Sequence, residues 1–162
     1  MTSQSQLDAA FGRELKKIIS DTTIEIVEMM FGYKLCSATP ADLQGERVAS
    51  FVTFTQGEAR VKFCMTFEKP FIQSLIRDIY PEDVLSKQAS AIYQDTASEL
   101  TNIICNRIKA YINGNGFDYE VSIPEPELTP APEDNPDFFR LGFSMEDSAQ
   151  SDNVLYLNVR QL

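Results

Sequence analysis

The chain has 162 residues, of which 43% are hydrophobic, and its formal net charge at pH 7 is −10. This length and composition predict one globular domain over residues 1–162 with an ordinary apolar core. The negative charge argues against nucleic acid as a partner, because phosphate backbones are bound by clusters of lysine and arginine that this sequence lacks. Membrane spans need roughly 18 uncharged apolar residues, and no such stretch or signal peptide is found, so we expect a cytoplasmic protein without membrane contact.

Several residue types that catalysis often uses are scarce. The chain has no histidine, which excludes Ser-His-Asp triads, histidine-bearing zinc sites and a cysteine nucleophile activated by histidine. Cys36, Cys64 and Cys105 form no CxxC pair, as expected for reduced thiols in the cytosol. Any chemistry must therefore come from carboxylates, amides, hydroxyls, lysines or the groups of a partner. A metal-dependent hydrolase is not expected, because prolines scatter the carboxylates of the acidic segment 124–137 and no ligand spacing recurs.

The first predicted element is a helix over about residues 6–32. Leu7, Phe11 and Leu15 keep a helical spacing, and Gly32 is a stop signal. Residues 22–27 are rich in β-branched side chains, which predict a bend or break in the middle of this helix.

A β-hairpin follows, with strands over 48–55 and 59–68 on either side of Gln56-Gly57. In the second strand apolar and polar side chains alternate. This pattern is typical of an antiparallel sheet with one covered and one more polar face.

Two helices come next. Pro70 suits the first turn of a short helix over 71–80, which Pro81 ends. A long helix then begins near Ser86 and stops at the Asn-Gly-Asn-Gly run of residues 113–116.

Three more strands are predicted over 117–123, 138–145 and 153–160, each with its apolar residues on one face. A proline-rich acidic segment, 124–137, separates the first two, and its composition favours an extended solvated loop, with a binding role as the alternative. The fold expected is α+β in the order α-β-β-α-α-β-β-β, an antiparallel sheet of about five strands with both long helices packed on one face. A free sheet edge in such a domain also favours pairing with a second copy, so we expect a homodimer.

The stretch DTASELTNIICNRIK, residues 95–109, carries a line of polar residues along the long helix. Asp95, Glu99, Asn102 and Asn106 fall at i, i+4, i+7 and i+11 and therefore share one helical face. Spacing alone is typical of the solvated face of an amphipathic helix. A carboxylate beside a carboxamide also suits phosphoryl transfer, in which a neutral amide can hold the attacking water in line while the carboxylate pairs with a cation of a partner.

The pattern Asp95-x-x-x-Glu99-x-x-Asn102, followed by a proline in SIPEP, resembles the signature of the CheC, CheX and FliY family of chemotaxis phosphatases. The run ELTNIICNRIK is most similar to the active-site helix of CheX, and the order of elements is similar across most of the chain. The resemblance implies a phosphatase that hydrolyses the phospho-aspartate of a CheY-type response regulator. Asn102 would position the attacking water and Glu99 would contact the regulator's lysine. Asp95 and Asn106 would be binding residues on the same face, and magnesium would be held by the regulator.

Asn102 is the first asparagine of the chain, so the first helix cannot hold a second copy of the motif. This resembles CheX, which has one site per subunit and forms a homodimer. Two details differ from related sequences: Asn106 stands where they often have glycine, and the signature proline is either Pro124 or Pro126.

Two alternatives to a phosphatase use the same residues differently. A noncatalytic adaptor of this fold would bind a response regulator or a flagellar switch component without turnover. A purely structural dimeric domain would carry the polar line only as a solvated helix face.

Overall fold

The computed structural model of the protein describes residues 3–38, 46–77, 79–127, 139–145 and 154–161. The helices are α1 (Ser3–Phe31), α2 (Lys69–Ile76) and α3 (Glu82–Gly114). The strands are β1 (Leu35–Ala38), β2 (Arg47–Gln56), β3 (Ala59–Glu68), β4 (Glu120–Val121), β5 (Glu125–Pro126), β6 (Phe139–Met145) and β7 (Val154–Gln161). The predicted α+β class is confirmed, with the short strands β1 and β5 in addition to those expected.

The described strands form one seven-stranded sheet in which every pairing is antiparallel. The strand order is β1-β6-β7-β3-β2-β4, and β5 also pairs with β2. The centre of the sheet joins distant parts of the chain, since Phe67 of β3 lies opposite Leu155 of β7. β1 pairs with β6 on one side only, and among the described residues its other side has no partner strand.

The hairpin of β2 and β3 has the predicted strands and a turn shifted by one residue. Gln56 pairs with Ala59, so the two turn residues are Gly57 and Glu58. Gly57 has φ of +60°, while no residue other than glycine has positive φ in the described chain. Positive φ at the first turn position alone corresponds to a type II′ turn, which matches the twist of paired strands and favours glycine there.

The strand predicted over 117–123 is much shorter in the structure. Only Glu120–Val121 pairs with β2 as β4, and β5 makes a separate short pairing farther along. The hydroxyl of Ser122 accepts a hydrogen bond from the Thr53 amide at 2.8 Å, so a side chain takes the place of a backbone acceptor there. Prolines 124 and 126 lack the amide hydrogen of a regular ladder, and Ile123 is 83% exposed instead of facing the core.

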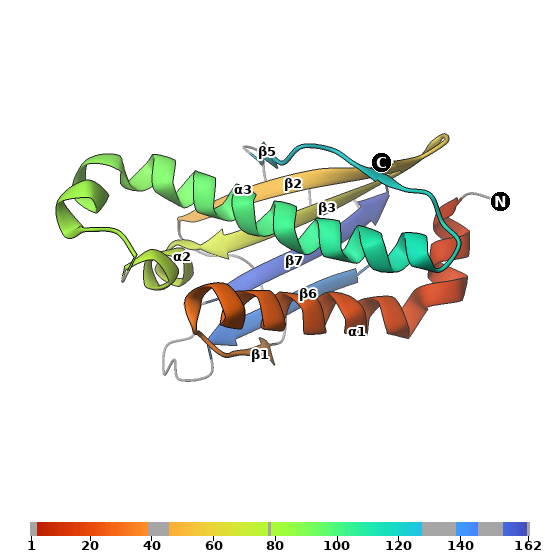
Figure 1. Ribbon diagram of the computed structural model, residues 1–162, viewed down its shortest axis with the longest axis horizontal. Coiled ribbons are helices and arrows are strands. Elements are labelled where there is room, and N and C mark those ends of the chain that lie inside the picture. The colour runs from red at the N-terminus through yellow and green to blue at the C-terminus, as the bar shows by residue number, and fades with distance from the viewer. Residues whose placement is uncertain (1–2, 39–45, 78, 128–138, 146–153, 162) are drawn as a thin grey trace.

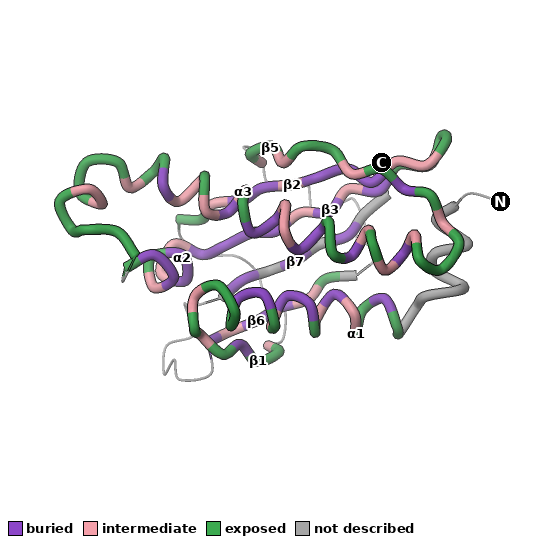
Figure 2. The backbone as a smooth tube through the Cα atoms, in the orientation of Figure 1, coloured by how far each residue is buried: buried purple, intermediate pink, exposed green. Residues whose placement is uncertain are grey.

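Both long helices cover the same face of the sheet, as predicted. Figure 1 shows α1 and α3 side by side in front of the strands, and Figure 2 shows buried and exposed residues alternating along α3 and along the coloured part of α1. The core lies between these layers. It joins apolar side chains from the helices and the inner sheet face, among them Ile19, Ile26, Val52, Phe63, Met65, Leu100, Ile104, Phe143, Leu155 and Leu157.

Helix α1 continues through residues 22–27, so the chain does not break there. Thr22 and Thr23 are buried there. The Thr23 hydroxyl donates a 2.8 Å hydrogen bond to the Ile19 carbonyl one turn earlier, which satisfies the buried group inside the helix. Burial of the neighbouring apolar residues outweighs the weak helix propensity of the β-branched run.

Helices α2 and α3 both differ in one bound from the predicted helices. Helix α2 has Pro70 in its first turn as expected, but it ends at Ile76. Helix α3 begins directly after Pro81 and is interrupted at Gln88, whose φ of −131° and ψ of 20° are not helical. Its predicted C-terminal stop is confirmed, and Gly116 has φ of +99° where the chain reverses. Within the described residues, none of the helices combines the length and apolar character that crossing a membrane requires.

Most of the predicted proline-rich loop, 124–137, lies outside the described residues. Its first four residues are described and contain β5.

Candidate active site on helix α3

The four residues of the predicted polar line lie along the outward side of α3. Asp95, Glu99 and Asn106 are exposed and Asn102 is half-buried. On the opposite side of the same helix, Leu100 is fully buried. The expected amphipathic division of this helix is confirmed, and the polar line faces away from the core.

Apolar packing and a small polar seam together set the rotation of α3 about its axis. The amide of Gln94 donates to the Ala49 carbonyl of β2 at 3.2 Å. The hydroxyl of Ser98 lies 3.4 Å from both Gln94 Nε2 and the hydroxyl of Ser50. These contacts tie one flank of the helix to β2, so the adjacent face with Glu99 and Asn102 is held toward the outside.

Sequence reasoning missed this seam. Gln94 and Ser98 are four residues apart, so they lie on one helical side next to the polar line. Such a pair is a weak signal by itself, because solvated helix faces carry many polar pairs with the same spacing. Only the packing of α3 on β2 distinguishes them from surface residues.

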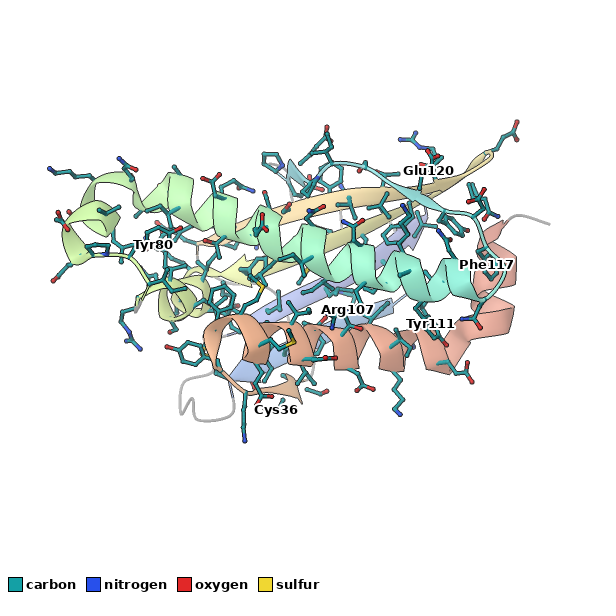
Figure 3. All side chains as sticks on the ribbon, in the orientation of Figure 1. Cys36, Tyr80, Arg107, Tyr111, Phe117 and Glu120 are labelled. Carbon is teal, nitrogen blue, oxygen red and sulfur yellow. The ribbon has the colours of Figure 1, made fainter. Side chains whose placement is uncertain are left out.

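The other flank of α3 is linked to α1. The Arg107 guanidinium lies 3.3 Å from the carboxylate of Glu25, on the side of α3 that faces α1 (Figure 3). Both side chains are substantially exposed, so this ion pair adds little to stability. It does pair the side chain of Arg107, the residue after Asn106, with α1. Among the described residues, Asp95 and Glu99 form no ion pair, so both carboxylates are available to a cation of another molecule.

Asn102 and Asn106 contact each other directly. Nδ2 of Asn106 lies 2.8 Å from the backbone carbonyl oxygen of Asn102 and 2.9 Å from its side-chain Oδ1. The side chain of Asn102 forms no other hydrogen bond with the described residues. The structure therefore brings two of the predicted site residues into one hydrogen-bonded pair.

The segment that follows α3 runs beside this face. Ser122 donates its amide to the Thr53 carbonyl at 3.0 Å, and Glu127 donates its amide to the Ala49 carbonyl at 3.0 Å. Glu127 also forms an ion pair with Lys62. Pro126 lies opposite Ser50, the residue whose hydroxyl meets Ser98 of α3. Both prolines that could match the signature, 124 and 126, therefore lie in a segment that is anchored to β2 next to the polar line.

Other chemistry-bearing groups are poorly placed for catalysis. Burial raises the pKa of the Cys105 thiol well above its ordinary value of 9.0, which keeps it protonated and unreactive. Among the described residues, no group of three or more Cys, Asp or Glu side chains is arranged to hold a metal ion. A shallow hollow between α2 and α3, lined by Gln73, Ser74, Arg77 and Tyr93, does not include the polar line.

Known proteins resemble this chain in part of its sequence and in its fold. Residues 48–127 match the family described as Chemotaxis phosphatase CheX, a range that contains Asp95, Glu99, Asn102 and Asn106. No curated protein matches the chain.

Three solved structures illustrate the shared fold. The chemotaxis protein CheX of Vibrio vulnificus has a TM-score of 0.66 at 14% identity, over 92% of this chain and 99% of that one. A CheC-like superfamily protein of Shewanella sp. PV-4 has 0.65 at 14% identity, over 90% and 95% of the two chains. CheX in a CheX-CheY-BeF3-Mg2+ complex from Borrelia burgdorferi has 0.65 at 14% identity, over 90% and 96%. With the family match over residues 48–127 and this fold along nearly its whole length, the chain is a CheX-like protein.

Proposed function

We propose that this protein is a phosphatase that hydrolyses the phospho-aspartate of a CheY-type response regulator. The observation that carries the proposal is the pair Glu99 and Asn102, presented outward from α3 in a CheX-like fold. The Borrelia burgdorferi neighbour, solved as a complex with CheY, supports a regulator as the partner. We further propose that the protein acts in the cytoplasm, as a homodimer.

In the proposed reaction, Asn102 enters the regulator's active site and holds a water molecule in line with the phosphoryl group. The water oxygen forms a bond to phosphorus while the bond from phosphorus to the aspartate oxygen breaks. The products are inorganic phosphate and the free aspartate carboxylate. A carboxamide suits this task because it both donates and accepts hydrogen bonds without becoming charged.

Glu99 has a separate role in docking. Its exposed carboxylate, one helical turn before Asn102, would pair with the regulator's lysine and set the register of the complex. Asp95 and Asn106 extend the same face by one turn at each end and complete the proposed docking strip. Magnesium, held by the regulator's own carboxylates, would neutralise phosphoryl charge, so this chain needs no metal ligand of its own.

The direct test uses a CheY-type regulator from the same cell, phosphorylated with a small-molecule donor in the presence of magnesium. We expect the protein to accelerate phosphate release and Asn102→Ala to lose the acceleration by on the order of 100-fold, because the water is no longer oriented. Asn115→Ala is the matched control, since Asn115 is exposed at the end of α3 and its side-chain amide donates to the Tyr111 carbonyl outside the polar line.

Full activity in Asn102→Ala would contradict the role of Asn102. Binding of the phosphorylated regulator without any acceleration by the unmodified protein would contradict the phosphatase and establish the adaptor.

A further inference from the structure

In the contact between Asn106 and Asn102, the side-chain nitrogen of Asn106 lies near two acceptor oxygens of Asn102. Nδ2 of Asn106 carries two hydrogens, and it has two acceptors within hydrogen-bonding distance. One is the backbone oxygen of Asn102 at 2.8 Å and the other is its side-chain Oδ1 at 2.9 Å. The amide nitrogen of Asn106 is therefore engaged by a single residue, one turn earlier on α3.

The backbone acceptor fixes the orientation of both amide groups. A carbonyl oxygen only accepts, so the atom of Asn106 that lies 2.8 Å from it must be the donor nitrogen and not Oδ1. The atom of Asn102 that lies 2.9 Å from this nitrogen must in turn be an acceptor, which is Oδ1. The Asn102 amide therefore points its oxygen toward Asn106 and leaves its own Nδ2 free as a donor.

This contact gives the Asn102 carboxamide, the group proposed to hold the attacking water, one defined orientation. Oδ1 of Asn102 retains a second lone pair for a water hydrogen, and Nδ2 can donate to a water or phosphoryl oxygen. Without Asn106, the Asn102 side chain has no hydrogen-bonding partner among the described residues that would select one rotamer or one amide orientation. Holding the group before the partner arrives avoids ordering it during the reaction.

We propose that Asn106 is a positioning residue, which holds the Asn102 carboxamide in the orientation that catalysis requires. This inference rests on the proposed phosphatase function and refines the role of Asn106 from binding the partner to acting through Asn102. Its amide nitrogen contacts Asn102 within the chain, so we expect its contribution in the rate of the chemical step. The affinity for the regulator is set by other residues of the strip.

The kinetic test compares Asn106→Leu, which keeps a similar shape without polar atoms, and Asn106→Asp, which replaces the donor by an acceptor. We expect kcat for the phosphorylated regulator to fall about tenfold in the leucine variant, with KM within about twofold. The aspartate variant falls further, because its carboxylate faces two acceptor oxygens and favours the reversed Asn102 amide. Both variants fold normally, since Asn106 is exposed and thermal unfolding by circular dichroism provides the check.

Binding in an Asn102→Ala background separates positioning from direct contact. We expect this background to have lost most of its turnover, so the dissociation constant for the phosphorylated regulator can be measured with little hydrolysis. Adding Asn106→Leu leaves that constant unchanged if Asn106 acts only through Asn102. An equal loss of affinity with and without Asn102 would show that Asn106 contacts the partner and would overturn the proposal.

A measurement without any regulator tests the contact itself. We expect the ¹⁵N order parameter of the Asn102 side-chain amide to fall in Asn106→Leu, while that of Asn113, which bonds the Tyr119 carbonyl at 2.9 Å, stays unchanged. Equal mobility of Asn102 in the two proteins would overturn the positioning role. If the contact is found but no regulator is dephosphorylated, the proposed function fails and the ordering of Asn102 stands.

Discussion

Asn102 and Asn106 occupy the middle of a helix in which alanine would be the better helix former. Each asparagine costs very roughly 0.5 kcal/mol relative to alanine, because its side chain competes for backbone hydrogen bonds in non-helical conformations. Here Asn106 instead donates back to the Asn102 carbonyl inside the helix. Residues that oppose local propensity are candidates for a functional role, and we propose that the two amides present a single oriented group to the regulator.

The negative charge of Glu99 is the property that we propose to matter for binding the phosphorylated regulator. Glu99→Gln keeps the shape and removes the charge, so we expect the affinity for the phosphorylated regulator to fall about tenfold while kcat changes little. The difference between the two proteins should shrink as salt is raised, because the lost interaction is electrostatic. Titration of the regulator at two ionic strengths measures both effects.

The control for this prediction is Glu28→Gln at an exposed position of α1, which makes the same change in net charge outside the polar line of α3. If both glutamine variants bind alike, Glu99 has no specific cation partner and its docking role is wrong.

At the scale of the element, α3 shows why a solvated face and a functional face have the same sequence signature. Its apolar residues pack on the sheet, and its polar line faces outward in either case. The amphipathic pattern predicted the helix and its outward residues. The interruption at Gln88 could not be predicted, since no proline or glycine marks it.

The two faces of α3 should separate stability from activity. Leu100→Ala removes a fully buried side chain and should lower the free energy of unfolding by about 2–5 kcal/mol. Asn102→Ala lies on the opposite face and should change it by no more than about 0.5 kcal/mol. Urea denaturation of the two variants checks this. Similar losses of unfolding free energy in both variants would mean that Asn102 contributes to packing.

At the scale of the whole molecule, the sheet decides how the helices and the candidate site are held. Its central pairing joins β3 to β7, and β1 joins β6 rather than a neighbour in sequence. The alternation in the long strands β3 and β7 predicted which residues face the core, as Phe63, Met65 and Leu157 do. It did not predict the strand order, because the same alternating face can pack against several neighbours.

The open side of β1 leads to a prediction about assembly. Edge strands favour pairing with a second chain, so we expect light scattering after gel filtration to give twice the mass of one chain. If the two β1 edges pair, the exposed Cys36 of each copy lies near the interface, and a short thiol-reactive cross-linker should couple the unmodified protein but not Cys36→Ser. A monomeric mass at all concentrations would contradict the homodimer.

The amino-acid sequence by itself determined the helices, the hairpin, the core faces of the main strands and the polar line with Glu99 and Asn102. These features depend on periodicity and on turn residues, which act over one or two turns or across a tight hairpin. Tertiary structure alone decided the strand order, the shortened strand near Ile123, the seam of Gln94 and Ser98 on β2, and the orientation of the Asn102 amide. The first three require segments far apart in the chain to pack together, and the last requires side-chain rotamers that spacing cannot specify.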